Sequence, residues 1–191
     1  MQTITRKGTF DSAHRVMNEA MKCFNLHGHT YHFELEFSFL SVADIGYAID
    51  FKEIKRVGSQ WIDDVLDHGV ILNPHDTSLI ETSRQLKSKM WLMSLNGEDG
   101  YCNPSVENIA KEIYLALDLL FNDQGIACGL TLESITLYET PNCYTRCDIR
   151  SFSDDEIRHF YDRNKDELIA YRDGKGIMVY DDRLDGDGHG A

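Results

Sequence analysis

The chain lacks several features that would assign it to a common protein class. No segment approaches the roughly 20 apolar residues that a membrane-spanning helix needs, and the first residues, MQTITRKGTF, carry no apolar stretch of the signal-peptide kind. The five cysteines form an odd set without the paired CxxC spacing of a structural zinc site. We therefore expect no membrane partner, no disulfide framework, and a reducing, cytoplasmic location.

Positive charge is also scarce. The chain has 19 Lys and Arg residues against 32 Asp and Glu residues, which gives a net charge of −13. Nucleic acid phosphates are bound by faces rich in lysine and arginine, so this balance excludes nucleic acid as a partner. An anionic small molecule would need local basic residues, for which Arg6, Lys7, Arg15 and Lys22 are available.

The chain does have the composition and patterning of one packed domain with additions. Of its 191 residues, 42% are hydrophobic. Residues 3–14 and 130–139 read as strands, and residues 27–39 alternate so strictly that His27, His29 and the following apolar residues share one face. Helices are predicted from the Asp50 cap to about residue 68 and from Pro104-Ser105 onward. This order predicts an α+β fold with helices on one face of a mainly antiparallel sheet.

Two segments fall outside this simple plan. Residues 74–103 read as an insertion of the lid or interface kind, in which residues 78–95 could form an added helix. Residues 153–171 read as an appended, serine-capped helix, and the Gly- and Asp-rich residues 181–191 as a loose tail. The predicted domain plan is therefore a domain over 1–150 that contains the 74–103 insertion, and a C-terminal extension over 151–191.

Three histidines within sixteen residues form the best candidate site. His27 and His29 are two apart on a strand, so both rings project from one face about 7 Å apart at the backbone, and His14 near the end of the other early strand can join them. A catalytic zinc takes three protein ligands and keeps one position open. The competing interpretation is an HxH arising by chance. His32 points to the other face of this strand, and His75, His159 and His189 lie in a loop, the appended helix and the tail, so we expect all four to be surface histidines.

Cys23 stands four residues before His27, in the loop beside this predicted site. A thiolate there can be a fourth ligand that closes the site, or a base or nucleophile whose pKa a nearby cation lowers. A buried structural thiol is the third alternative. Spacing alone leaves all three open.

Asp67 and His68 close the first predicted helix. An aspartate beside a histidine can orient the imidazole or stabilise its protonated form, as proton-transfer pairs do. The simpler interpretation is a histidine at a helix end that interacts with the helix dipole.

Several of these residues occur together in a pattern that resembles the 6-pyruvoyltetrahydropterin synthase family, which includes the bacterial 6-carboxytetrahydropterin synthases. The matching segments lie in the family's order and approximate spacing at 10–14 (FDSAH), 23–31 (CFNLHGHTY), 50–55 (DFKEIK), 66–68 (LDH), 104–108 (PSVEN) and 139–140 (ET). The resemblance covers roughly residues 1–150. It implies a tunnelling fold, with trimers that close their sheets into a barrel, trimers stacked in pairs as hexamers, and active sites between subunits.

The resemblance also implies roles for individual residues. His14, His27 and His29 would bind zinc, which would act as a Lewis acid on the substrate side chain. Cys23 would be the base, and Asp67 with His68 would be the proton-relay pair. Glu139 would anchor the pterin ring, and Ser105 stands where the family usually has threonine. After Asp67-His68 this chain has one residue more than the family pattern before Leu72-Asn73.

The implied substrate is 7,8-dihydroneopterin triphosphate. The favoured function is a zinc-dependent lyase that forms 6-carboxy-5,6,7,8-tetrahydropterin and releases acetaldehyde and triphosphate, as in queuosine biosynthesis. One alternative is a 6-pyruvoyltetrahydropterin synthase that eliminates triphosphate only. Others are a non-catalytic zinc- and pterin-binding oligomeric protein and, ranked lower, a histidine-zinc hydrolase.

Overall fold

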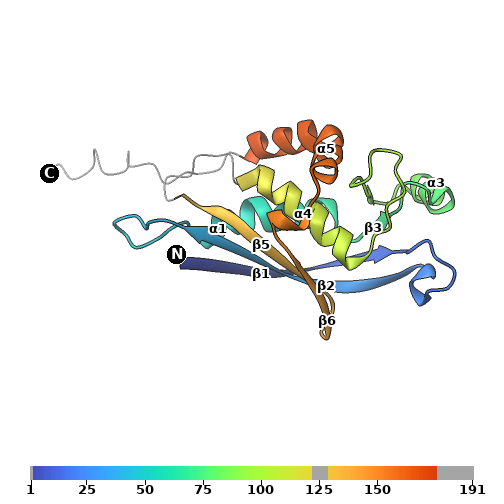
Figure 1. Cartoon of the computed structure of the whole chain (residues 1–191), viewed down its shortest axis with the longest axis horizontal. Coiled ribbons are helices and arrows are strands. Elements are labelled where there is room, and N and C mark those ends of the chain that lie inside the picture. Colours follow the sequence, from blue (N-terminus) through green and yellow to red (C-terminus); the bar gives the residue numbers. More distant parts are fainter. Residues whose placement is uncertain (1, 122–128, 176–191) are drawn as a thin grey trace.

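A computed structural model describes residues 2–121 and 129–175. One sheet runs through the whole molecule in the strand order β4-β3-β1-β2-β5-β6. The bounds are β1 Gln2–His14, β2 His27–Phe39, β3 Gly69–Leu72, β4 Met90–Leu92, β5 Thr131–Thr140 and β6 Cys143–Cys147. Helices α1 (Phe51–Ile54), α4 (Val106–Phe121) and α5 (Asp154–Lys175) all lie on the same side of this sheet (Figure 1).

The α+β class and the helices on one face are confirmed, and the sheet is mixed. Strand β1 pairs antiparallel with β2, β2 with β5, and β5 with β6. At the other end β1 pairs parallel with β3, and β3 parallel with β4. The chain reaches β3 from β2 through the helical residues 51–65, and it reaches β4 from β3 through the helix at residues 77–86. Neither parallel pair is therefore joined by a hairpin turn.

The strict alternation in β2 has the expected consequence. Tyr31, Phe33, Leu35 and Phe37 are almost fully buried beneath the helices, and His32 on the other face is exposed. Strand β1 matches this pattern, because Phe10 pairs with Tyr31 and His14 pairs with His27. One face of the two central strands therefore belongs to the core, and the histidines lie at the end of that face.

The first predicted helix begins where expected but is not regular. The Asp50 side chain accepts a hydrogen bond from the Lys52 amide at the start of α1, Phe51–Ile54. A π-helical segment, η2 Lys55–Ser59, follows, and then α2, Gln60–Val65. A Cβ atom added at Gly58 would lie 3.0 Å from the Phe121 ring, so glycine permits this part of the helix to approach α4 closely.

The second predicted helix is α4, Val106–Phe121, and it forms the centre of the helical layer. Its apolar residues pack on the sheet, and eleven of its residues are buried. The predicted C-terminal helix is α5, Asp154–Lys175, and Ser153 caps it by accepting from the Glu156 amide while Glu156 accepts from Ser153. Its Phe160 and Leu168 belong to the same core as the sheet. The predicted tail at 181–191 lies outside the described residues.

The segment 74–103 differs from the expectation of a helix over residues 78–95. Helix α3 spans Thr77–Leu86 only, and Lys87 ends it with a left-handed backbone conformation, φ 55°. Strand β4 follows and pairs with β3. The apolar residues around Trp91 are thus used for pairing and packing at the sheet edge, which outweighs their helix propensity.

Short 3₁₀ segments complete the fold, at η1 Lys22–Phe24 and η4 Ile149–Ser151. Within residues 2–121 and 129–175, every helix is too short or too polar to cross a lipid bilayer.

Candidate active site

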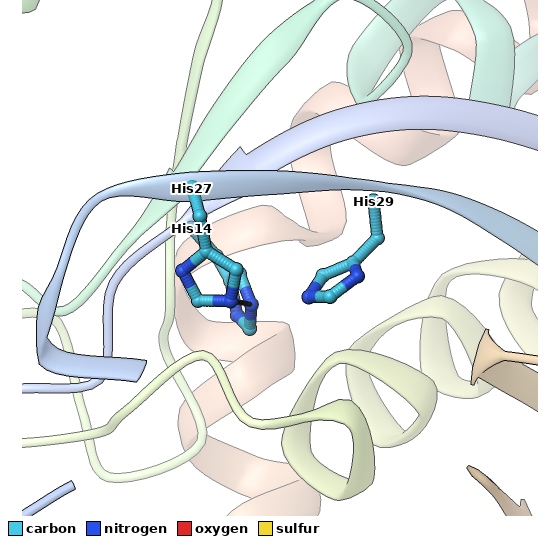
Figure 2. A group of neighbouring side chains, drawn as sticks. All are labelled: His14, His27 and His29. Atoms are coloured by element: carbon cyan, nitrogen blue, oxygen red, sulfur yellow. Dashed lines mark hydrogen bonds between the residues drawn. The ribbon is translucent and has the colours of Figure 1, made fainter. Parts of the chain in front are cut away.

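The three predicted histidines converge. His14 ends β1, and His27 and His29 begin β2 on the face that the helices cover. Their candidate ligand nitrogens all lie within 4.8 Å of one another. Figure 2 shows the His27 ring in front of the His14 ring and the His29 ring beside them, and the His14 and His27 ring centroids are 4.6 Å apart. His14 is fully buried, while His27 and His29 are partly buried.

Backbone carbonyls determine which nitrogens face one another. The Nδ1 atom of His14 lies 2.7 Å from the Pro104 oxygen, and Nδ1 of His27 lies 2.7 Å from the Asn25 oxygen. A carbonyl oxygen only accepts, so both Nδ1 atoms carry the proton and donate it. Each Nε2 atom is therefore left with a lone pair, as in a metal-ligating histidine whose other nitrogen is held by the protein.

These two lone pairs lie close together. The Nε2 atoms of His14 and His27 are 3.2 Å apart, the contact drawn as a dashed line in Figure 2. With both Nδ1 atoms protonated, this contact is favourable only if a cation lies between the rings or one ring takes a proton. Nitrogens bound to a tetrahedral zinc at ~2.0 to 2.1 Å are themselves about 3.3 Å apart. The spacing suits such an ion.

A metal ion suits this position better than a proton does. Burial lowers the pKa of His14, and the hydrogen bond to the Pro104 oxygen only partly opposes this shift. Nε2 of His29 is buried and has no hydrogen-bond partner among the described residues. Buried polar atoms without a partner are costly, and a bound metal ion would satisfy this one. The donor set therefore fits a divalent metal.

Glu139 lies beside the histidines in the same chain. It stands near the end of β5, and its Oε1 atom is 3.6 Å from Nε2 of His14 and 3.9 Å from Nε2 of His29. Its side chain is 21% exposed, so one carboxylate borders the metal position and can still be reached from solvent. This placement is compatible with an anchor for a ligand that carries paired N–H donors.

Cys23 lies in η1, in the loop that connects β1 to β2. Its thiol is free and half-buried. Among the described residues, the group of potential ligand atoms within 4.8 Å of one another contains the three histidines and not Cys23. Of the three roles left open for this thiol, the geometry supports a fourth ligand least.

Asp67 and His68 form a pair, but not at the histidine cluster. Nδ1 of His68 donates to Oδ2 of Asp67 at 2.5 Å, and Oδ1 of Asp67 accepts from the Asp11 amide at 2.6 Å. His68 has a φ of 56°, and 78% of its side chain is exposed. It borders a shallow hollow with Asp11, Gly28 and Thr30, positions on the sheet face opposite to the histidine rings, and His29 also lines this hollow. Among the described residues, no hydrogen bond or ion pair joins Asp67 or His68 to the three clustered histidines.

The pair is charged as a proton-relay pair would be. The hydrogen bond from His68 to Asp67 raises the pKa of His68. Partial burial raises the pKa of Asp67, but the hydrogen bonds from the Asp11 amide and from His68 outweigh it, and the net shift is downward. The pair therefore holds its proton on the imidazole.

Ser105 lies at the start of α4. Its hydroxyl accepts from the Asn108 amide at 3.4 Å, and its carbonyl accepts from the Ile109 amide. It directly follows Pro104, whose carbonyl oxygen holds His14. The described contacts of Ser105 are those of a helix cap, with its side chain partly exposed.

Sequence reasoning did not single out Tyr31 as part of the site. Its ring is fully buried and stacks on Phe10, with centroids 4.9 Å apart, and it meets the His29 ring edge-on at 5.6 Å. Its hydroxyl is buried without a hydrogen-bond partner among the described residues. The available signal was its position, two residues after His29 on the same strand face.

The four remaining predicted surface histidines have different outcomes. The predicted surface position of His32 and His75 is confirmed, whereas His159 is partly buried and contacts the Leu95 oxygen. His189 lies outside the described residues.

Comparisons with known proteins point to one family. The family model for 6-pyruvoyl tetrahydropterin synthase matches residues 3–149. A Rickettsia felis protein named 6-carboxy-5,6,7,8-tetrahydropterin synthase is 33% identical over 144 residues, which cover 73% of this chain and 95% of that protein. A Haemophilus influenzae protein of the same name is 30% identical over 150 residues, covering 75% and 96%.

A solved structure supports the fold. The 6-pyruvoyl tetrahydropterin synthase of Plasmodium falciparum superposes with a TM-score of 0.57 at 18% identity, covering 76% of this chain and 96% of that chain. At this identity the likeness concerns the fold alone. The match of the family model over most of the chain, and relatives at 30% identity or more, show that this chain belongs to the 6-pyruvoyl tetrahydropterin synthase family.

Proposed function

We propose that this protein is a zinc-dependent lyase that converts 7,8-dihydroneopterin triphosphate to 6-carboxy-5,6,7,8-tetrahydropterin and releases acetaldehyde and triphosphate. The observation that carries the proposal is the pair of Nε2 atoms of His14 and His27, 3.2 Å apart, with His29 and Glu139 beside them. The names of the Rickettsia felis and Haemophilus influenzae relatives favour the carboxy product.

Zinc is the proposed ion because imidazole ligands suit it and because three histidines leave a coordination position open for a substrate. When bound, zinc would supply Lewis acidity to the hydroxyl groups of the substrate side chain. His14 and His27 are held in one tautomer by the Pro104 and Asn25 oxygens, so the protein itself presents their Nε2 atoms to the ion.

The remaining residues bind the pterin and move protons. Glu139, 21% exposed beside the histidines, accepts hydrogen bonds from the guanidine-like edge of the pterin, which offers paired N–H donors. Cys23 removes a carbon-bound proton from the side chain, and Ser105 assists in binding. His68, which shares its proton with Asp67, exchanges protons with the side-chain hydroxyls.

Because His68 lies on the opposite sheet face from His14, we propose that it serves the site of a neighbouring subunit. The described sheet ends in two edge strands, β4 and β6, whose unpaired backbone groups favour pairing with other copies. A trimer that closes its sheets into a barrel, and a hexamer of two such trimers, would remove these edges.

The proposal also covers the organisation of the chain and its setting. Residues 1–150 would form the synthase domain with 74–103 as an insertion, and 151–191 the extension. The proposal also predicts a cytoplasmic location and a role in queuosine biosynthesis.

Metal analysis combined with a turnover assay on 7,8-dihydroneopterin triphosphate tests this function. We expect about one zinc per chain, release of acetaldehyde, and loss of turnover on chelation. Cys23→Ala should abolish turnover with zinc retained, because the thiol acts as a base. Loss of zinc from this variant would instead make Cys23 a ligand.

The same assay separates the alternatives. Release of triphosphate without acetaldehyde would identify a 6-pyruvoyltetrahydropterin synthase, the activity for which the matching family model is named. A protein that holds zinc and binds a pterin but does not turn over 7,8-dihydroneopterin triphosphate would be a non-catalytic family member.

A further inference from the structure

The loop that carries Cys23 is tied to the segment 74–103. Arg15 donates from Nε and Nη2 to the two carboxylate oxygens of Asp76, both at 2.7 Å. Asp76 is only 1% exposed, and the same guanidinium lies over the Phe24 ring, 5.1 Å from its centroid. A planar guanidinium can make this two-pronged contact and stack at the same time, which a lysine cannot. In Figure 1 the β1–β2 loop and α3 lie at the same end of the molecule.

A second tie holds Met17, two residues further along the loop. Its amide donates to Oδ1 of Asn103 at 3.0 Å, and its carbonyl accepts from the Tyr101 hydroxyl at 2.6 Å. Oδ1 of Asn103 also accepts from Nδ2 of Asn73 at 2.9 Å. Asn73 and Asn103 thus join the two ends of the segment and hold the loop with the same oxygen.

Val16 and Arg15 also contact Cys23 and its neighbour Phe24. The Val16 amide donates to the Cys23 carbonyl at 2.8 Å, so the start of the loop pairs with the residue that carries the thiol. Phe24, on which Arg15 stacks, is the next residue in the chain. A displacement of Arg15 or Met17 would therefore move the Cys23 backbone.

The segment is itself firmly held by α4 and α5. The buried carboxylate of Glu112 accepts from Trp91 Nε1 at 2.5 Å, from the Leu95 amide at 3.1 Å and from the amide and hydroxyl of Ser94. From α5, Arg163 donates to the Leu92 carbonyl at 2.8 Å. Asn164 donates to the Ser94 hydroxyl at 2.9 Å. The 74–103 segment is therefore fixed to α4 and α5, and it in turn holds the β1–β2 loop.

We infer that the 74–103 segment, supported by α5, positions the Cys23 loop for catalysis, with Asp76 as the principal positioning residue. This inference rests on the proposed function for the role of Cys23 as the base. Asp76 is not a catalytic residue: it acts on the thiol through Arg15, Val16 and Phe24.

Asp76→Asn tests the inference, because asparagine is as good a helix cap as aspartate and leaves the start of α3 intact, while the charge that holds Arg15 is lost. Hydrogen exchange of the zinc-loaded full-length variant, followed by mass spectrometry, should show about tenfold faster exchange in peptides covering residues 15–26. Peptides from β2 and α4 should keep their wild-type rates, and zinc content should stay unchanged.

Turnover gives the second readout. In Asp76→Asn we expect kcat to fall about tenfold with KM nearly unchanged, because a misplaced base impairs the chemical step more than binding. Arg15→Lys should have a kcat between those of Asp76→Asn and the wild type, because lysine keeps the positive charge but cannot make the two-pronged contact with Asp76. Tyr101→Phe, at an exposed tyrosine, removes the hydroxyl that donates to the Met17 carbonyl and accepts from Nδ2 of Asn103 at 3.3 Å. It keeps the pair of Arg15 with Asp76, so it should show a smaller change of the same kind.

Gln85→Ala is the matched control. Gln85 is exposed on the same helix, and among the described residues its one side-chain hydrogen bond is to Glu81, so exchange and kcat should match the wild type. Unchanged exchange of residues 15–26 in both Asp76→Asn and Tyr101→Phe would overturn the inference, whatever the turnover. Absence of turnover in the wild-type protein would count against the proposed function, while the exchange measurement would still decide the positioning.

Discussion

At the scale of single residues, the carbonyl oxygens of Asn25 and Pro104 are as important as the histidines that they hold. By accepting from Nδ1 of His27 and His14, they leave two Nε2 lone pairs facing each other in a largely buried position. Without a cation this contact between two lone pairs is unfavourable, so binding a cation there stabilises the folded chain.

Metal removal should therefore destabilise the protein. Because a ligand that binds only the folded state stabilises it by about 4 kcal/mol at a thousandfold excess over Kd, chelation of the purified protein should lower its Tm by several degrees. His29→Ala should lower zinc content and make the Tm insensitive to chelator. Calorimetry with and without chelator checks this, and an equal chelator effect in both proteins would contradict the assignment of His29.

Substitution of Tyr31 is expected to preserve or increase stability. Its buried hydroxyl has no partner among the described residues, and an unsatisfied buried polar group costs about 1 to 3 kcal/mol. Tyr31→Phe removes that hydroxyl and keeps the stacking on Phe10. Urea denaturation of the metal-free protein should show equal or greater stability in the variant. A loss above about 1 kcal/mol would mean that the hydroxyl has a partner after all.

At the scale of elements, Glu112 joins α4 to β4 and the residues that follow it. Burial raises the pKa of this carboxyl to about 7, although the hydrogen bonds from Ser94, Trp91 and the neighbouring amide act against the shift. The folded state thus holds this proton more tightly than the unfolded chain, whose ordinary value is 4.5. The stability that the group contributes is complete below pH 4.5 and is lost as the pH rises to about 7.

Glu112→Gln should remove this pH dependence, because the amide does not titrate. Urea denaturation of the wild type and the variant between pH 5 and pH 8 should give a difference in unfolding free energy that shifts against the wild type as the pH rises to about 7 and then levels off. A difference that is constant across this range, or that shifts in the other direction, would show that the hydrogen bonds keep the carboxylate ionised throughout.

At the scale of the whole molecule, His68 borders the sheet face opposite to the histidine rings, and Cys23 lies in the loop that joins His14 at the end of β1 to His27 at the start of β2. If neighbouring subunits combine these groups, Cys23→Ala and His68→Ala each inactivate a different half of the shared site. Co-expression of the two variants should then restore a fraction of the turnover that neither has alone. Each variant co-expressed with a tagged copy of itself is the control, and no restoration in the mixed assembly would place both groups in a single-chain site.

Local patterns in the sequence were sufficient for much of this fold. The period-two alternation of residues 27–39 predicted the buried face of β2, because successive side chains on a strand point to opposite sides wherever the strand lies. The Asp50 cap, the helix after Ser105 and the serine cap of α5 were predicted from contacts within a few residues. The same locality brought His27 and His29 onto one face as candidate ligands.

What the sequence by itself determined is therefore the local part: element types, the face of each strand, and the histidine pair with its third partner in the facing strand. Only the tertiary structure decided that Lys87 ends α3 and that β4 joins the sheet in parallel, since both depend on pairing with a distant strand. The tie from Asp76 to Arg15 and the separation of His68 from His14 were decided there as well. These contacts join residues tens of positions apart, whose meeting depends on the packing of the whole chain and not on any local preference.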